Sequence, residues 1–300
     1  VWIGQNGKGI LKASPNFRRV RHLFAGNSVY GAVFSETKGT VTAVLPTKIL
    51  VYPENASSNA ERIARQSQAK VLGHWRHSAD KSGNQWLLAA GNLQSQLVKT
   101  TPDGAQKFFE IPGSFKVPGN LTTDEDGFVW LASERRLYQF DTRAENWKTY
   151  SLESVFSINP EIFCLQKTPD GTLWIGTQAG LLEAKPDGKG DFAHTLHTVE
   201  SGKLRHNAVS ALLHEPLHPQ VLWIATKGGG LARLGLPTRQ FLHFYSRDGL
   251  PNDVLYGILP DTLGNLWMSS NKGIIRYTPA TGAIRNFTEA DGLQSDEFNT

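Results

Sequence analysis

Apolar and polar positions follow one another along this chain in a repeated order of polar turn, apolar triplet, glycine turn and second apolar run. The clearest copy is the stretch Thr168–Leu182, in which Asp170-Gly171 precedes Leu173–Ile175. An Asp-Gly pair between apolar runs favours a tight hairpin turn, because glycine reaches positive φ without strain. Three consecutive apolar residues indicate a strand that is buried on both faces. The stretch therefore predicts two adjacent strands joined by tight turns.

The same phrase returns along the whole chain, centred each time on one position of the apolar triplet. Successive copies lie 40, 44, 44, 44, 49 and 44 residues apart, and the second copy has threonine where the others have tryptophan. A period of about 40 to 50 residues is typical of four-stranded propeller blades. The sequence predicts an all-β, seven-bladed β-propeller that occupies residues 1–300 as a single domain. The anchors are Trp2, Thr42, Trp86, Trp130, Trp174, Trp223 and Trp267.

Each copy is expected to form four strands, A to D, with the anchor on strand B. Strand A is short and apolar, strand C usually follows a glycine, and strand D is more polar and aromatic. The weakest stretch is Asn55–Gln68, where Ala, Ser, Asn, Arg and Gln replace the pattern. A long loop or a short helix is expected there.

Two matching phrases predict how the ring closes. Gly249–Leu255 leads from one D strand to the next A strand, and Gly292–Phe298 matches it in register. The chain begins at a B strand, so we expect its last residues to supply the A strand of the first blade. Closure of this kind removes exposed sheet edges, which propellers otherwise have to protect.

Composition changes this picture little. The formal charge of +4 comes from 31 basic and 27 acidic residues, and the basic stretch Phe17–His22 alternates with apolar positions as an outer strand does. No nucleic-acid partner is predicted. The single cysteine, Cys164, lies in an apolar strand and is expected to be buried filler. No apolar run is long enough to span a bilayer and no signal peptide is recognisable. The absence of an initiating Met indicates a fragment of a longer chain.

Two motifs have the form of chemical sites, and neither is expected to be one. His214–His218 matches the H-E-x-x-H zinc pattern, but Pro216 is incompatible with the helix that this pattern requires. Lys227–Gly230 is rich in glycine like a phosphate loop, but it opens a strand and not a helix. No catalytic residue, metal or cofactor is predicted.

A ligand is expected where the loops gather around the propeller's channel, on the side of the B-to-C turns and D-to-A loops. The polar residues there suit a hydrogen-bonding ligand such as a sugar. His206 and Asp253 also lie in these loops, without a reason to pair. The candidate ligand-binding residues are Gln5, Asn6, Asn92, Arg135, Gln178, Arg205, Asn207, Lys227, Asn252 and Asn271.

The repeated G-x-L-W-I-G-T phrase, together with the closing phrases at 248–253 and 291–299, resembles the two-component regulator propeller family. In that family the propellers form the periplasmic sensor of membrane-anchored histidine kinases, often hybrid kinases that detect oligosaccharides, and of some diguanylate cyclases. The resemblance implies a periplasmic location within an inner-membrane protein. It also implies a downstream β-sandwich and a membrane-spanning signalling segment in the same chain, and it is compatible with a homodimer.

Three functions remain open at this stage. The first is a sensor that binds a small carbohydrate-like ligand and signals through downstream domains. The second is a propeller-type lyase or hydrolase, because lyases that inactivate antibiotics carry similar glycine and tryptophan repeats. The third is a protein-interaction scaffold. The fold cannot choose among them, because function resides in the loops.

Overall fold

The computed structural model of the chain is all-β. It describes strand backbone at 2–5, 9–12, 21–23, 31–35, 40–45, 48–53 and 63–65, and then residues 77–90, 95–103, 105–113, 120–215, 217–293 and 295–298. Side chains are described from residue 78 onward, except at 89 and 90. Within these residues the only helical segments are two short 3-10 turns, η2 (Ser246–Asp248) and η3 (Glu289–Asp291). None of the described helical segments has the length and hydrophobicity to cross a membrane.

The chain divides into two compact units, one of residues 2–12 and 22–150, the other of residues 1, 13–21 and 151–300. Strands β1 to β15 fall in the first unit apart from Arg21 and Ser151, and β16 to β27 form the second. Each sheet is antiparallel and joins strands that are consecutive in sequence. The sheets are β1-β2-β3, β4 to β7, β8 to β11, β12 to β15, β16 to β19, β20 to β23 and β24 to β27.

The first unit contains short strands at its start and longer ones toward residue 150. Its strands are β1 (Trp2–Gln5), β2 (Gly9–Lys12), β3 (Arg21–Leu23), β4 (Gly31–Ser35), β5 (Thr40–Leu45), β6 (Lys48–Pro53), β7 (Ile63–Arg65), β8 (His77–Ala79), β9 (Gln85–Ala90), β10 (Ser95–Thr100), β11 (Gln106–Glu110), β12 (Asn120–Thr123), β13 (Phe128–Ser133), β14 (Arg136–Asp141) and β15 (Asn146–Ser151).

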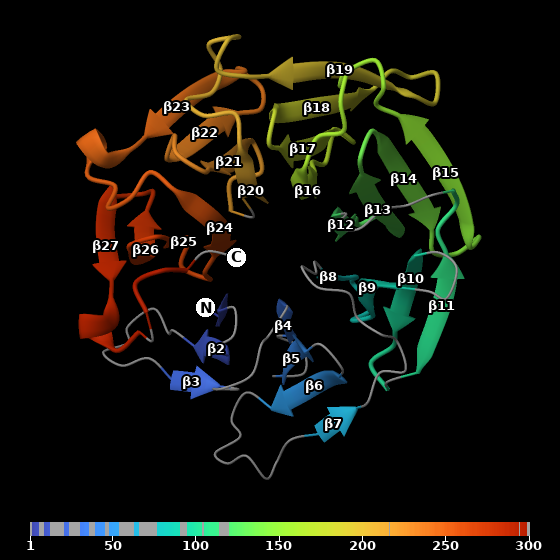
Figure 1. Cartoon of the computed structure of the whole chain (residues 1–300), viewed down its shortest axis with the longest axis horizontal. Helices are drawn as coiled ribbons and strands as arrows, with labels where there is room; N and C mark the ends of the chain where they lie inside the picture. The colour runs from blue at the N-terminus through green and yellow to red at the C-terminus, as the bar shows by residue number, and fades with distance from the viewer. Residues whose placement is uncertain are drawn as a thin grey trace. The chain divides into compact units, whose positions relative to one another are not determined.

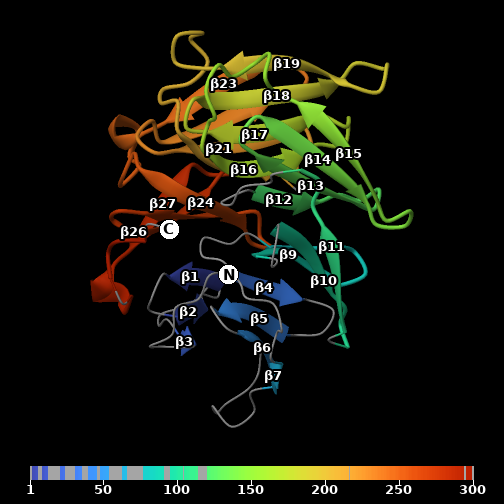
Figure 2. The ribbon, with the colours of Figure 1, turned by 45° about the vertical axis from the view of Figure 1, so that its right-hand side comes forward.

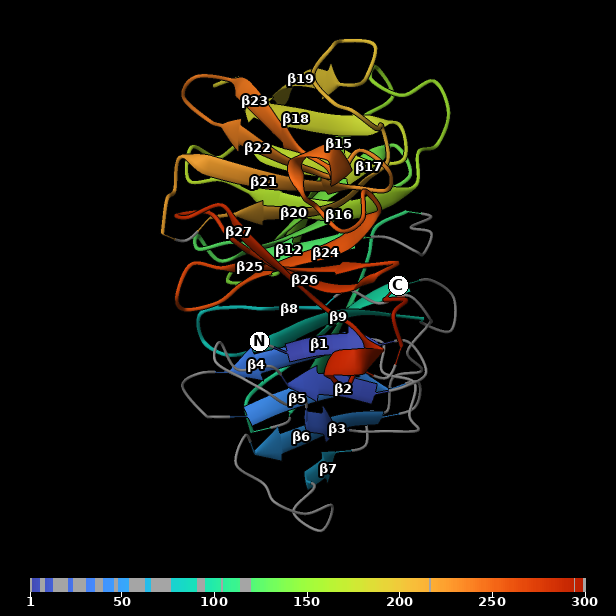
Figure 3. The same ribbon diagram turned by 90° about the vertical axis from the view of Figure 1, so that its left-hand side faces the viewer.

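In the second unit the strands of each sheet lie in chain order, as Figures 1 and 2 show for β16 to β19 and Figure 3 shows for β20 to β23. Its strands are β16 (Ile162–Lys167), β17 (Leu173–Thr177), β18 (Gly180–Pro186), β19 (Phe192–His197), β20 (Val209–His214), β21 (Val221–Thr226), β22 (Leu231–Gly235), β23 (Gln240–Phe244), β24 (Leu255–Pro260), β25 (Leu266–Ser270), β26 (Gly273–Thr278) and β27 (Ala283–Phe287).

Six of the sheets contain four strands in chain order, as the predicted order A to D requires, whereas the sheet β1-β2-β3 contains three. Every anchor lies in the second strand of its sheet, except Trp2, which lies in the first strand of the three-stranded sheet. Strands β17 and β21 are buried along their whole length, as their apolar triplets predict. The expectation of a loop or helix at 55–68 is wrong at Ile63–Arg65, which pairs with β6 as β7. Two predictions lie outside the described residues. One is that the last residues supply the A strand of the first blade, and the other is that seven blades close into a ring.

The anchor tryptophans occupy repeated surroundings. Those at 86, 130, 174, 223 and 267 are at most 3% exposed. Each packs against a ring from the fourth strand of its own sheet, with ring centroids 5.4–6.1 Å apart. The partner rings are Phe109, Tyr150, His197, Phe244 and Phe287. A buried indole therefore ties the second strand to the outer strand in each of these sheets.

The indole N–H of each of these five tryptophans also has an acceptor in the turn before it. Trp267 donates to Asp261 at 2.8 Å, and Asp261 also accepts backbone N–H groups of Leu263 and Asn265. Burial alone would raise the pKa of Asp261, but the hydrogen bonds from Trp267, Asn265 and Leu263 lower it overall. Trp86 and Trp130 use Asp80 and Asp124 in the same way, again six residues earlier. One carboxylate thus fixes both the turn and the indole.

In two sheets a residue other than aspartate accepts the indole N–H. Trp174 donates to the hydroxyl of Thr168 at the longer distance of 3.3 Å, and Thr168 in turn donates to Asp170 at 2.7 Å. Trp223 donates at 2.7 Å to Glu215, eight residues earlier, where an insertion lengthens the turn. The geometry of the indole is kept while the acceptor changes.

The two closing phrases form one repeated loop. After each 3-10 turn a glycine at φ 95°, Gly249 or Gly292, reverses the chain. The carboxylate of Asp253 then accepts the N–H of Ser246 at 2.7 Å, and Asp296 accepts that of Glu289 at 2.8 Å. The backbone carbonyl of each aspartate accepts a glycine N–H in the turn before the third strand, from Gly230 to Asp253 and from Gly273 to Asp296. Each loop is thereby fastened to the sheet that precedes it.

Replacing Trp267 by Phe should destabilise the protein more than replacing Trp174 by Phe. Both changes remove part of a buried ring, but only the first leaves a carboxylate without its indole donor, which costs about 1–3 kcal/mol. We expect W267F to lower the free energy of unfolding by about 1 kcal/mol more than W174F, measured by urea denaturation. Equal losses would show that the carboxylate does not contribute.

Replacing Gly273 by Ala should destabilise the protein more than replacing Gly282 by Ala. Both glycines have positive φ, 94° and 73°, so both variants incur left-handed strain of about 1–2 kcal/mol. A Cβ at Gly273 would meet the carbonyl of Phe287, whereas nothing lies within 4 Å of one at Gly282. We expect G273A to lower the melting temperature clearly beyond G282A; matching shifts would contradict the proposed role of this turn.

Candidate functional site

Three of the predicted ligand-binding residues occupy equivalent positions in the second unit. Gln178, Lys227 and Asn271 each follow directly on the second strand of a sheet, after β17, β21 and β25. The first strands of these sheets are linked, because Cys164 in β16 contacts the carbonyl of Val209 in β20, and Ser210 in β20 donates to the carbonyl of Leu255 in β24. The three turns therefore belong to a connected set of strands.

Each of these first strands carries a bulge at the same place. The pairing register shifts between Ile162 and Cys164, between Val209 and Ala211, and between Leu255 and Gly257. The skipped residues are Phe163, Ser210 and Tyr256. A bulge changes the direction in which a side chain points, and bulges are common beside functional sites. Here they bring two aromatic rings to the ends of the strands near the turns.

Lys227 lies close to the first of these rings and within 6.0 Å of the second. Its ammonium group is 3.8 Å from the centroid of Phe163 and 6.0 Å from the centroid of Tyr256. The backbone N–H of Lys227 donates to Ala208 at 2.9 Å, and Lys227 forms an isolated bridge with Val254. A cation held over aromatic faces gains about 0.5–2 kcal/mol, depending on its exposure. This arrangement holds the ammonium beside the first strands.

The third turn joins the same group. The hydroxyl of Tyr256 donates to the side-chain oxygen of Asn271 at 2.9 Å. Among the residues that the structure describes, Tyr256 is bonded to the side-chain oxygen of Asn271 and no residue is bonded to its NH₂ group, which is therefore available to a ligand. Phe163, Lys227, Tyr256 and Asn271 thus form a continuous cluster across three successive sheets. We call these four residues the lysine–aromatic cluster.

The structure gives the other predicted residues different roles. Asn207 accepts the N–H of Val199 at 2.8 Å and Asn252 accepts that of Val254 at 2.7 Å, so both support loops. Gln178 is exposed and Arg135 is half-buried, in turns of different units. Arg205 is exposed, and its charge adds to burial in lowering the pKa of His243. The side chain of Gln5, and Asn6 and Asn92, lie outside the described residues.

His206 and Asp253 are not brought together as an acid–base pair. The ring of His206 accepts the N–H of Ala208 at 3.1 Å, and the carboxylate of Asp253 binds Ser246. The H-E-x-x-H motif is also accounted for. His214 contacts the carbonyl of Pro219, and His218 contacts Glu215, which holds Trp223. Among the residues placed by the structure, no group of three or more His, Cys, Asp or Glu side chains could hold a metal ion.

A second charged cluster surrounds Trp174. Glu183 contacts His197 at 3.0 Å and Arg239 at 2.6 Å, and its side chain is 10% exposed. Arg239 lies over the indole at 5.4 Å from its centroid, and His197 stacks on the indole. In the sheet β24 to β27 the corresponding positions are Arg276 and Phe287. The cluster is therefore a local variant of the tryptophan packing, with all three groups committed to one another.

Sequence reasoning named Lys227 and Asn271 as candidates but did not name Phe163 or Tyr256, the aromatic residues that lie beside them. Phe163 and Tyr256 read as ordinary apolar positions of A strands, and a bulge leaves no signal in a single sequence. One signal was available, namely that the residues after the second strands are Gln, Lys and Asn, and that lysine is the only charge among them. The neighbouring rings could then have been sought in the preceding strands.

Comparison with known proteins agrees with this organisation. A family profile described as "Two component regulator propeller" matches residues 157–179, which include Phe163, Trp174 and Gln178. Histidine kinase P4 of Formosa agariphila is 22% identical over 228 residues. That match covers 58% of this chain but 16% of the kinase, so the chain corresponds to a small part of that protein's length.

Solved structures share the fold at low identity. Virginiamycin B lyase from Staphylococcus aureus has a TM-score of 0.65 at 16% identity, covering 86% of this chain and 83% of the lyase. The extracellular domain BT3049 of B. thetaiotaomicron, whose name assigns it to a hybrid two component system, has a TM-score of 0.52 at 14% identity. It covers 99% of this chain and 50% of that domain. These likenesses support the propeller-like, all-β fold alone.

The family profile, the kinase relative and the repeated sheets agree on one classification. The resemblance of this chain to the two-component regulator propeller family is confirmed.

Proposed function

We propose that this chain is the extracytoplasmic sensor segment of a two-component histidine kinase and that it binds a small carbohydrate-like ligand. The observation that carries the proposal is the lysine–aromatic cluster, set at the turns where the sequence predicts a ligand. The family resemblance and the name of the kinase relative support the signalling role. A periplasmic location in an inner-membrane protein belongs to the same proposal.

The chemistry of the cluster suits a saccharide. Ligand sites combine aromatic surface with a few placed polar groups. Phe163 and Tyr256 supply rings, while Lys227, Asn271 and the exposed Gln178 supply groups that bond hydroxyls. In the enzyme alternative, an acid–base pair with shifted pKa values would be required at the turns. His206 and Asp253 do not form such a pair, because each binds elsewhere. The sensor is therefore the function that these contacts favour.

Signalling requires that the ligand distinguish two arrangements of the protein. A coupling of about 1–3 kcal/mol is typical of such systems. The cluster spans three sheets, so a ligand bound to it favours one spacing of β16, β20 and β24 over another. The response would pass to a β-sandwich and a membrane-spanning segment of the same chain, or to a second copy of the chain.

The proposal includes closure of seven four-stranded sheets into one ring. Asp253 is fastened to Gly230 just before β24 begins, and Asp296 is fastened to Gly273 in the same way. By this analogy the residues after Asp296 begin a first strand, and the three-stranded sheet β1-β2-β3 has place for one. Phe298, which is 2% exposed, is the first apolar residue of that segment.

Deleting residues 293–300 should therefore increase amide hydrogen exchange in β1, because β1 would lose a neighbouring strand. Peptides covering residues 1–12 would report the change by mass spectrometry. As a control, peptides from β17 should keep their protection. Unchanged exchange in β1 would contradict closure through the C-terminal segment.

A thermal-shift panel of neutral and acidic oligosaccharides tests the ligand class. At a concentration 100 times the dissociation constant, a ligand that binds only the folded state stabilises it by about 2.7 kcal/mol, which is readily measured. We expect at least one glycan to raise the melting temperature, and Tyr256→Ala to abolish that rise. If no member of the panel stabilises the protein, the carbohydrate proposal is wrong, and a protein-interaction scaffold becomes the better interpretation.

A further inference from the structure

We propose that Lys227 is an anion-recognition residue and that the ligand is an acidic saccharide, one whose sugar ring carries a carboxylate or a sulfate group. This inference rests on the proposed carbohydrate function and narrows it. Three observations support it. They are the aromatic contacts of Lys227, the hydrogen bonds that the nearby carboxylates already make, and the neutral residues at the two equivalent turns.

The ammonium group of Lys227 has aromatic neighbours but no carboxylate within ion-pair distance among the described side chains. The residue is half-buried, and its ammonium group lies over the rings of Phe163 and Tyr256. A ring face compensates a cation only in part, whereas a hydrogen bond to a carboxylate or sulfate oxygen is charge-assisted and about twice as strong as a neutral one. The site thus presents a positioned positive charge that a ligand anion can satisfy.

The carboxylates of the adjoining loop are already engaged. Asp253 accepts both the N–H and the hydroxyl of Ser246, at 2.7 and 2.9 Å. Asp248 accepts the N–H of Tyr245 at 3.2 Å. In the preceding loop Glu200 lies 3.3 Å from the amide nitrogen of Asn207. These acids cap loop backbone or brace loop side chains, so none of them is placed to neutralise Lys227.

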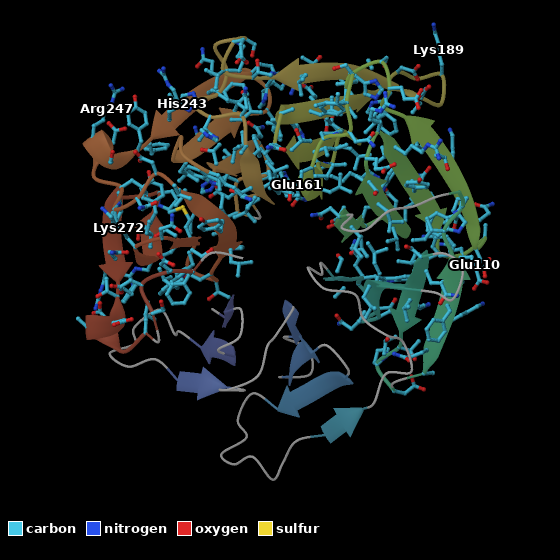
Figure 4. The ribbon with its side chains drawn as sticks, in the orientation of Figure 1. Glu110, Glu161, Lys189, His243, Arg247 and Lys272 are labelled. Carbon is cyan, nitrogen blue, oxygen red and sulfur yellow. The ribbon has the colours of Figure 1, made fainter. Side chains whose placement is uncertain are left out.

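Of the three residues that follow the second strands, only Lys227 is charged. The residues equivalent to Lys227 are Gln178 and Asn271, both neutral. Lys272, one residue further along the last of these turns, is exposed, and in Figure 4 its label lies apart from that of Glu161, the residue before β16. Among the three residues that follow the second strands, a ligand at the cluster therefore meets one cation and two neutral amides. This pattern fits a single acidic group on a molecule that is otherwise rich in hydroxyls.

The rings define the rest of the ligand. The faces of Phe163 and Tyr256 offer apolar surface beside the ammonium, and the C–H face of a sugar ring is the complementary apolar surface. The free amide of Asn271 can donate to a hydroxyl on the same sugar, because Tyr256 occupies the oxygen of that amide and not its nitrogen. A simple inorganic anion would use Lys227 but neither ring nor amide.

Matched glycans that differ only in charge test the inference. Tetragalacturonate and its fully methyl-esterified form share one backbone, and a sulfated oligosaccharide with its desulfated form makes a second pair. Isothermal titration of the protein at low and at high salt should show binding of the acidic member at least about tenfold tighter, with the preference shrinking as salt rises.

Variants assign the preference to Lys227. We expect Lys227→Gln to bring the acidic member down to the affinity of its neutral partner, and Lys227→Arg to retain a preference. Lys272→Gln is the matched control, because it removes a lysine from a neighbouring turn and should change nothing. Each variant must keep the wild-type melting temperature without ligand, so that lost binding is not lost folding.

The outcomes separate the two proposals. Equal affinity for acidic and neutral members, or a preference that survives in Lys227→Gln, would overturn the role of Lys227 while the carbohydrate proposal stands. Stabilisation by neutral glycans alone would do the same. If no glycan of either kind binds, both proposals fail together.

Discussion

The hydrogen bond from a buried indole to a carboxylate in the preceding turn is the interaction on which the rest of these sheets depend. A tryptophan in the second strand is useful to the core only if its polar N–H finds an acceptor, since a buried donor left unpaired costs about 1–3 kcal/mol. Asp80, Asp124 and Asp261 supply that acceptor and at the same time fix the turn that aims the strand. One acid and one indole, six residues apart, therefore set both the register of the hairpin and the position of the core.

The sheet around Trp174 shows how such a constraint can be met with other residues. Its turn acceptor is a threonine, its outer ring is His197, and its cross-strand partner is Glu183 where other sheets have Lys99 or Arg276. An acid and a histidine beside an indole would be costly without a cation, because buried charges need partners. Arg239 of the next sheet supplies it. The three departures thus accompany one another, and Glu183 contacts both His197 and Arg239.

The repeat made most of the fold predictable from sequence, because strand order and anchors depend on a period that is visible in a single chain. The acceptor of each indole was missed for the opposite reason: Asp261 and its equivalents look like ordinary turn residues until the indole is placed beside them. The lysine–aromatic cluster was likewise only partly predictable from the sequence. Lys227 and Asn271 were found from their turns, whereas Phe163 and Tyr256 depend on bulges that shift the register of β16 and β24, and no local pattern in the sequence reports a bulge. Glu215 lies eight residues before its indole and not six, because the turn contains an insertion, so its role as the indole acceptor could not be predicted from the repeat.

The fold constrains some turn positions strongly and leaves one position in each of three turns free to vary. In the five sheets whose side chains the structure describes, an indole acceptor occupies the turn before the anchor. The turn before the third strand requires a glycine at Gly230 and at Gly273, because a side chain there would meet a carbonyl. The position directly after the second strand is under neither constraint. Gln178, Lys227 and Asn271 occupy this position in three sheets that have the same strand order, yet the three residues differ. A sequence can therefore change this position without disturbing the core, and the packing of the sheets does not require a charged residue at any of the three copies.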